Sequence, residues 1–314
     1  MVIVVDPRTI NVLSFCTGTG MLDAGLALAL GGTARTICYV EREAFCAALL
    51  AARMEEQAVD AAPLWSDVHT FDGKPWRGVV DFITGGYPCQ PFSFAGQRRG
   101  EDDPRHLWPS IARVIGEVEP FGCWFENVGG HLSLGFEQVR ADLQGLGYRV
   151  AAGLFTAEEV GAPHKRERLF ILALADPTHD HGRGGERGAQ AGVGTRGVGR
   201  GRSASGGAEL VYPEHDGGRA NLAGAGTQRR VVDRGAGGGG YGPFPPGPGD
   251  LITWRRILAD RPELAPAVEP RVRGVADGNA ARLDRLRACG NGVVPLCAAY
   301  AFVSLWASLQ GDQT

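Results

Sequence analysis

The fold is decided by the stretch VLSFCTGTGMLDAGLALAL at residues 12–30. It joins an apolar run, a glycine-containing turn and a second apolar stretch, which predicts a strand, a tight turn and a helix. Gly18 and Gly20 let the backbone bend sharply and approach a ligand, and the helix after them offers N–H groups at its start. The full GxGxxG pattern is missing, which argues against a pyrophosphate ligand. A turn of this kind that serves packing alone is the alternative.

The alternation of strands and helices continues to residue 176. The predicted strands are 11–16, 36–41, 79–85, 121–126, 149–155 and 168–174. The predicted helices are 21–30, 43–56, 107–117 and 134–146, with a short helix at 250–258 and a last amphipathic helix from about Val293 towards Leu309. This spacing predicts an α/β fold, a doubly wound and mainly parallel sheet with helices on both faces.

The composition changes sharply after Asp176. Residues 182–249 contain 23 of the 48 glycines, and nine arginines against five acidic residues make the stretch locally positive. Because it lacks periodic apolar residues, we expect loops there. The sequence therefore predicts three parts: a catalytic domain at 1–176, a smaller irregular region at 177–268, and a C-terminal segment at 269–314 that returns to the catalytic domain.

The chain as a whole favours a cytoplasmic protein without a membrane span. Its 314 residues are 44% hydrophobic, yet no apolar run reaches the roughly 20 residues that cross a bilayer, and the N-terminal stretch does not resemble a signal peptide. The seven cysteines form no CxxC pair, so neither a disulfide framework nor a zinc or other metal site is expected. Since the net charge is −3, a nucleic-acid partner would need a local basic face.

Two acidic residues follow predicted strands of the first half. Glu41 ends the second strand, where an acid is placed to bind ribose hydroxyls, and Asp67 follows the next apolar stretch, where it could bind an adenine amino group. The alternative for each is an exposed acid at the start of a loop.

Cys89 lies in the stretch GGYPCQPFSFAGQRRG at 85–100, directly after a predicted strand. Ligands bind at the carboxyl ends of parallel strands, so this cysteine is expected at the edge of the site. A thiolate is the nucleophilic form of cysteine, and backbone amides and nearby arginines could lower the pKa of the thiol. A lone cysteine is more often structural, but its Pro and Gln neighbours favour a nucleophile here. The loop at 95–106 is expected to close over a substrate.

An acid and two arginines are expected at the same edge. Glu126 ends the apolar strand in CWFENVGG, and its apolar neighbours could keep the carboxyl group partly protonated. Arg166 and Arg168 stand two apart before a strand, so their side chains can point the same way. A solvated basic turn is the alternative for the arginines.

Taken in order, these motifs resemble the DNA cytosine-5 methyltransferase family. The resemblance rests on GGYPCQPFS, WFENV, the RER of HKRERLF and the closing motif RLDRLRACGNGVVP, and it covers residues 12–176 and 275–306. It implies a Rossmann-like methyltransferase fold, double-stranded DNA as the partner, and S-adenosyl-L-methionine as the methyl donor. It also implies that 177–268 recognises the target sequence, in a monomer that could have a cognate restriction endonuclease.

The resemblance implies a role for each matching residue. Cys89 attacks carbon 6 of a flipped cytosine, Glu126 holds ring nitrogen 3 and the amino group, Arg168 contacts the oxygen at position 2, and Arg166 supports the site. The implied cofactor-binding residues are Cys16, Gly18, Gly20, Glu41, Asp67, Val68, Pro88, Leu107, Asn291 and Val293. Among these, Glu41 binds the ribose, Asp67 and Val68 frame the adenine, and Pro88 and Leu107 line the methyl donor.

Some residues depart from the family pattern. Cys16 stands where the family usually has Phe, and His164 stands where it usually has Gln. Three other readings stay open: an RNA cytosine-5 methyltransferase, a non-catalytic nucleic-acid-binding relative, and a cysteine hydrolase. The Cys89, Glu126 and Arg168 set argues against the second, and the third lacks a histidine in a recognisable hydrolase context.

Overall fold

The computed structural model describes residues 9–88, 107–178, 244, 246, 250–262 and 290–311. The strands are β1 (Ile10–Phe15), β2 (Ala34–Val40), β3 (Leu64–Trp65), β4 (Phe82–Gly85), β5 (Gly122–Val128), β6 (Tyr148–Phe155) and β7 (Arg168–Ala175). The helices are α1 (Met21–Ala29), α2 (Ala44–Glu55), α3 (Trp108–Val118), α4 (Phe136–Gly145), α5 (Leu251–Asp260) and α7 (Pro295–Gly311). Short 3-10 turns are η1 (Val68–Thr70), η2 (Lys74–Trp76), η3 (Gly129–Leu132) and η4 (Glu158–Val160).

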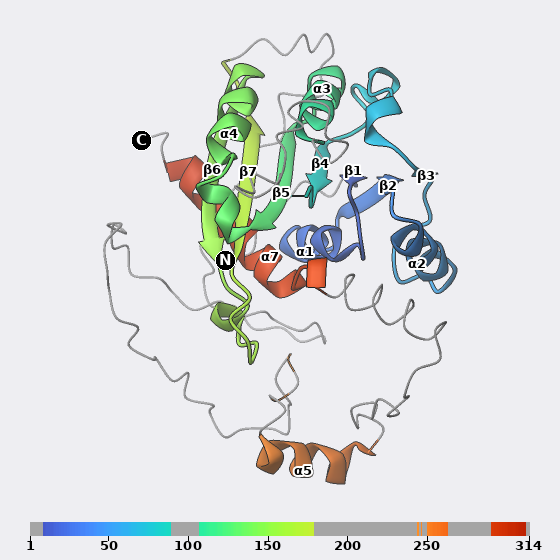
Figure 1. The fold of residues 1–314 in the computed structure, drawn as a ribbon, viewed down its shortest axis with the longest axis vertical. Helices are drawn as coiled ribbons and strands as arrows, with labels where there is room; N and C mark the ends of the chain where they lie inside the picture. Colours follow the sequence, from blue (N-terminus) through green and yellow to red (C-terminus); the bar gives the residue numbers. More distant parts are fainter. Residues whose placement is uncertain are drawn as a thin grey trace, which may run out of the picture. The chain divides into compact units, whose positions relative to one another are not determined.

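The strands form one mixed sheet in the order β3-β2-β1-β4-β5-β7-β6 (Figure 1). Strands β1 to β5 pair in parallel, and β7 runs antiparallel to both of its neighbours. Parallel neighbours need crossover connections, and α1, α2, α3 and the turns η1 and η2 supply them. The predicted doubly wound, mainly parallel α/β fold of the Rossmann-like type is confirmed.

Two apolar cores cover the two faces of the sheet. On one face, α3 and α4 pack on alternate strand residues such as Leu13, Ile83 and Phe125. On the other face, α1 and α7 pack on the intervening residues, such as Val12 and Trp124. Helix α3 buries an apolar stripe at i, i+3, i+4 and i+7 spacing, formed by Ile111, Val114, Ile115 and Val118.

Helices α1 and α7 lie side by side, although more than 260 residues separate them in the sequence (Figure 1). Gly25 of α1 permits the contact, because a Cβ atom there would lie 2.5 Å from the Cβ of Ala298 and 2.9 Å from the carbonyl oxygen of Pro295. Any larger side chain would push α7 away. This packing sets where the chain enters α7, and therefore where the residues just before Pro295 lie.

A buried acid fastens α1 to the sheet. Asp23 accepts hydrogen bonds from Ser14 of β1 at 2.7 Å and from Thr84 of β4 at 2.5 Å. Burial raises the pKa of Asp23 to about 6, and the two hydroxyl donors only partly offset that effect. The carboxyl group thus ties the first turn of α1 to the carboxyl ends of the two central strands.

Most sequence-based boundaries agree with the structure within about two residues, while three features differ. The sequence missed β3, whose two residues are too few to produce a pattern. It did not predict the reversed direction of β7, which forms a hairpin with β6. Helix α7 is not amphipathic as predicted, since it is buried along most of its length.

Helix α5 belongs to a second unit of the chain and is described by itself. It corresponds to the predicted helix at 250–258, and Asp250 caps it by accepting a hydrogen bond from the Thr253 amide at 3.1 Å. The proposed division into 1–176, 177–268 and 269–314 stays a prediction. Among the described residues, no helix is long and apolar enough to cross a membrane.

Candidate functional site

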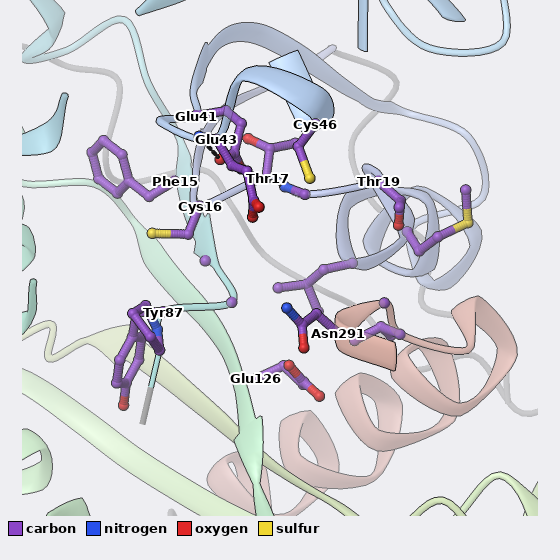
Figure 2. A pocket seen from close by; sticks show the side chains of 18 of the residues that line it. Phe15, Cys16, Thr17, Thr19, Glu41, Glu43, Cys46, Tyr87, Glu126 and Asn291 are labelled. Atoms are coloured by element: carbon purple, nitrogen blue, oxygen red, sulfur yellow. Dashed lines mark hydrogen bonds between the residues drawn. The ribbon is translucent and has the colours of Figure 1, made fainter. Parts of the chain in front are cut away.

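A cavity of about 680 Å³ opens at the carboxyl ends of β1, β2, β4 and β5. The segment 290–293, which precedes α7, closes one side of it. Figure 2 shows Glu41 and Thr17 at one end, and Glu126 and Asn291 at the other. Nine of the predicted site residues line this cavity: Cys16, Gly18, Glu41, Pro88, Leu107, Glu126, Arg168, Asn291 and Val293.

The turn between β1 and α1 is held to the end of β2 by Glu41. One carboxylate oxygen of Glu41 accepts the Gly18 amide at 2.7 Å, and the other accepts the Glu43 amide at 2.7 Å. Gly18 and Gly20 have φ of 56° and 75°, a left-handed conformation that glycine adopts without strain. Because each carboxylate oxygen can accept two hydrogen bonds, Glu41 keeps acceptor capacity for a ligand in the cavity.

Cys16 forms part of the wall at the same end of the cavity. Burial, with a smaller contribution from the Glu41 charge, raises the pKa of its thiol to about 12. The thiol therefore stays protonated at neutral pH, and Cys16 is a neutral wall residue without nucleophilic character. Burial also raises the pKa of Cys38 to about 11 and of Cys297 to about 12.

Four described residues of the predicted site do not line the cavity. Asp67 caps η1 by accepting the His69 amide at 2.9 Å, and Val68 is buried beneath the same turn. Gly20 packs towards Leu50 and Val59 of the α2 region. The fourth, Arg166, contacts residues 290–293 instead, and these residues are called the closing segment below.

Glu126, at the other end of the cavity, is paired with Arg168. The Arg168 Nε lies 2.9 Å from Glu126 Oε1. Both side chains are largely withdrawn from solvent, so the contact is a largely buried ion pair. Burial raises the pKa of Glu126 to about 7, and the charges of Arg168 and Arg166 only partly offset that effect. The carboxyl group can thus exist in both protonation states near neutral pH.

The predicted nucleophile Cys89 and the loop at 95–106 lie outside the described residues. The residues on either side are described. Pro88 is exposed and Leu107 is half-buried, and both line the cavity. The chain therefore leaves and re-enters the described part of the structure at this cavity.

Tyr87, two residues before Cys89, is anchored from the turn that follows β5. Its hydroxyl lies 3.0 Å from His131 Nε2, and its carbonyl oxygen accepts a hydrogen bond from Asn127 Nδ2 at 3.1 Å. The ring contacts Trp108 and Phe125, with centroid separations of 5.3 and 5.8 Å. The contact of His131 was not predictable, because nothing in one sequence indicates which buried hydroxyl a histidine will contact.

The closing segment is bound by the two predicted arginines. Arg166 donates to the carbonyl oxygens of Gly290, at 2.7 Å, and Gly292, at 2.5 Å. Arg168 donates a longer hydrogen bond to the same Gly290 oxygen, at 3.4 Å. These hydrogen bonds connect the start of β7 to the segment that carries Asn291. In the described part of the chain, no group of His, Cys, Asp and Glu side chains could hold a metal ion.

Comparison with solved structures finds a Dnmt2 methyltransferase of S. pombe, with a TM-score of 0.46 and 23% sequence identity, covering 55% of this chain and 52% of that one. A putative DNA modification methyltransferase encoded within an E. coli prophage has a TM-score of 0.44 and 25% identity, covering 53% of this chain and 47% of the other.

Comparison with curated proteins finds type II methyltransferases. M.NgoMIV of Neisseria gonorrhoeae is 33% identical over 166 residues, which cover 52% of this chain and 51% of that protein. M.BspRI of Lysinibacillus sphaericus is 31% identical over 187 residues, which cover 52% of this chain and 44% of that protein. The chain thus matches about half the length of these relatives, or slightly less.

The family model described as C-5 cytosine-specific DNA methylase matches residues 10–186, which is more than half of the 314 residues. The matched region contains the sheet, the β1–α1 turn, Glu126 and both arginines. The chain belongs to the C-5 cytosine-specific DNA methylase family.

Proposed function

We propose that this protein is a DNA (cytosine-5-)-methyltransferase that uses S-adenosyl-L-methionine and attacks the base with Cys89. The observation that carries the proposal is one cavity with two chemically different ends. One end has the glycine turn and the Glu41 acceptor, and the other has the buried Glu126–Arg168 pair. A cofactor and a base could therefore meet inside it.

The described residues fit S-adenosyl-L-methionine at the Glu41 end. The cavity volume of about 680 Å³ lies within the range of small-molecule sites. Glu41 has lone pairs left for ribose hydroxyls, and the backbone at Gly18 has no Cβ that would exclude a ligand. When bound, the cofactor supplies an electrophilic methyl group on a positively charged sulfur. The adenine contact of Asp67 and Val68 is proposed on their sequence position, since neither lines the cavity.

The Glu126 end suits a cytosine ring. A protonated Glu126 can donate to ring nitrogen 3, while its second oxygen accepts from the exocyclic amino group. Arg168 can donate to the oxygen at position 2. These contacts withdraw electron density from the ring, so that carbon 6 becomes susceptible to a thiolate. Glu126 lies near the carboxyl end of β5 and Arg168 at the amino end of β7, and the antiparallel pairing of these two strands brings both groups to the same edge of the sheet.

Cys89 then supplies the nucleophile. Its sulfur forms a bond to carbon 6, and the electron pair of the 5,6 double bond becomes available at carbon 5. Carbon 5 would then take the methyl group as the bond from that group to the cofactor sulfur breaks, with the electron pair of the broken bond remaining on the sulfur. A base removes the proton from carbon 5, the sulfur–carbon bond breaks, and the double bond is restored. The reacting atoms are inaccessible within a duplex, so the cytosine must flip out at a cost of a few kcal/mol.

The experiment that tests this function is methyl transfer from labelled S-adenosyl-L-methionine to duplex DNA and, in parallel, to transfer RNA. We expect label in the DNA alone, located at carbon 5 of cytosine by methylation-sensitive sequencing. Label in the RNA alone would replace the proposal by an RNA cytosine-5 methyltransferase. Binding of DNA without any transfer would make the chain a non-catalytic relative.

We also propose that residues 177–268 select the target sequence. In α5, Arg255 and Arg256 are exposed, as phosphate or guanine contacts require. A variant with 177–268 replaced by a short linker is expected to bind S-adenosyl-L-methionine, because Glu41 and Asn291 remain. The same variant should lose specific DNA methylation. Methylation of the same sites would show that recognition lies elsewhere, with 95–106 the next segment to test.

The proposed function extends to the cellular location, the oligomeric state and a partner endonuclease. The curated relatives are named type II methyltransferases. We propose a cytoplasmic, monomeric enzyme that belongs to a restriction-modification system and has a cognate restriction endonuclease. The two enzymes of one such system must recognise the same sequence. The sequence that this protein methylates, once mapped, should therefore be the one that the cognate endonuclease cuts when it is unmethylated.

A further inference from the structure

The two arginines of the RER motif do different things in the structure. Arg168 extends to Glu126 and contacts Gly290 only at 3.4 Å. Arg166 donates to two carbonyl oxygens of the closing segment, those of Gly290 and Gly292. Its guanidinium group therefore binds the wall of the cavity, whereas the family resemblance implied only that Arg166 supports the site.

The backbone of Arg166 supports this assignment independently. Arg166 has a φ of 38°, a left-handed conformation that is uncommon for residues with a Cβ atom. Strained backbone of this kind persists where surrounding contacts require it. Arg166 lies just before β7 begins at Arg168, and its two hydrogen bonds to the segment 290–293 are contacts that can hold such a conformation.

The acceptors of Arg166 are the backbone carbonyl oxygens of Gly290 and Gly292, on either side of Asn291. Gly290 and Asn291 are helical, whereas Gly292 to Val294 are not. A backbone carbonyl oxygen needs a hydrogen-bond donor when it is withdrawn from water, and a charged arginine is a strong donor. Both hydrogen bonds come from one guanidinium nitrogen, Nη2, which has two N–H groups to donate.

The gripped segment forms part of the cavity. Asn291 and Val293 both line it, and each is next to a glycine whose carbonyl Arg166 holds. In sequence, more than a hundred residues separate Arg166 from this segment. Packing of α7 against α1 positions Pro295, and Val293 and Val294 pack against the same apolar core. The hydrogen bonds from Arg166 add contacts further back, at Gly290 and Gly292.

We propose that Arg166 is a positioning residue for cofactor binding, which seats 290–293 so that Asn291 and Val293 form the cavity wall. This inference rests on the proposed function, because it takes the cavity to be the S-adenosyl-L-methionine site. It separates the task of Arg166 from that of Arg168, which acts on the base.

The test compares Arg166→Met and Arg166→Lys with the wild type. Calorimetry with S-adenosyl-L-methionine is expected to give a Kd about tenfold or more higher for Arg166→Met, since two hydrogen bonds from a charged group are lost. Arg166→Lys should fall between, because the ammonium group keeps the charge and its N–H donors but lacks the planar guanidinium that directs one nitrogen to both carbonyl oxygens. Arg140→Met is the matched control. Arg140 is an exposed arginine on α4 that pairs with Glu137, and its loss should leave the Kd unchanged.

A second readout separates positioning from action on the base. With saturating cofactor, the rate at which Arg166→Met forms a covalent adduct with DNA containing 5-fluorocytosine should stay within about threefold of wild type. An unchanged Kd together with a lost adduct would overturn the inference and indicate that Arg166 acts on the cytosine.

A third readout is independent of the cofactor. In the protein alone, amide hydrogen exchange of 290–294 should be faster in Arg166→Met than in wild type, and unaffected in Arg140→Met. Unchanged exchange would show that Arg166 does not hold the closing segment in place. If wild-type protein binds no S-adenosyl-L-methionine, the proposed function fails, while the exchange result still decides whether Arg166 holds the segment.

Discussion

Cys89→Ala is expected to abolish methyl transfer, with a loss of at least about four orders of magnitude in kcat. The reason is that carbon 5 of cytosine is a poor nucleophile until a thiolate has added at carbon 6. Alanine offers no lone pair for that addition, and a water molecule in its place is a far weaker nucleophile. The measurement is single-turnover methylation of duplex DNA with labelled S-adenosyl-L-methionine, which excludes product release from the rate.

Trapping identifies the residue directly. A duplex with 5-fluorocytosine at the target should form a stable adduct with the wild type, because fluorine cannot leave carbon 5 as a proton. Cys89→Ala should form none. Cys16→Ser is the matched control, since Cys16 also lines the cavity but has a thiol pKa of about 12, and it should still form the adduct. An adduct in Cys89→Ala, or none in Cys16→Ser, would contradict the assignment of Cys89.

The sequence predicted most of the fold because strands and helices of ordinary length leave a periodic pattern. Helix α3 shows this clearly, since its four apolar residues recur at helical spacing and all are buried. Strand β3 has only two residues, both exposed, so no pattern was available to predict it. The antiparallel direction of β7 could not be predicted from its own residues, because a buried strand shows a continuous apolar run in either orientation.

The candidate site could be predicted where a residue's position along its strand decides its place. Glu41 and Glu126 end parallel strands, and the structure places both at the same cavity. Contacts between distant segments could not be predicted. Asp23 resembles a surface acid of α1 in the sequence, yet it is buried against β1 and β4. The contact between Tyr87 and His131 and the hydrogen bond from Arg166 to Gly290 can likewise be seen only in the folded chain.

Glu126→Gln is expected to lower the rate of methyl transfer by about two to three orders of magnitude near neutral pH, the range of a lost general acid. Glutamine keeps the size of the side chain and can still donate an N–H to ring nitrogen 3. It cannot give up a proton as negative charge builds on the ring. The same variant should bind S-adenosyl-L-methionine with wild-type affinity, because Glu41 lies at the other end of the cavity.

The pH profile makes the test specific to Glu126. Burial raises the pKa of this carboxyl group to about 7, so its protonated form declines as the pH rises above that value. The thiolate form of a cysteine with the ordinary pKa, about 8.5, increases over the same range. The product of the two fractions is level between these pKa values and declines on both sides, so wild-type kcat/KM should have an acid limb and an alkaline limb. In Glu126→Gln the alkaline limb should disappear, since only the thiol still titrates. Glu167→Gln, which removes an exposed pairing partner of Lys165, should keep both limbs. An alkaline limb that persists in Glu126→Gln would assign that titration to another group and remove the proton-donor role from Glu126.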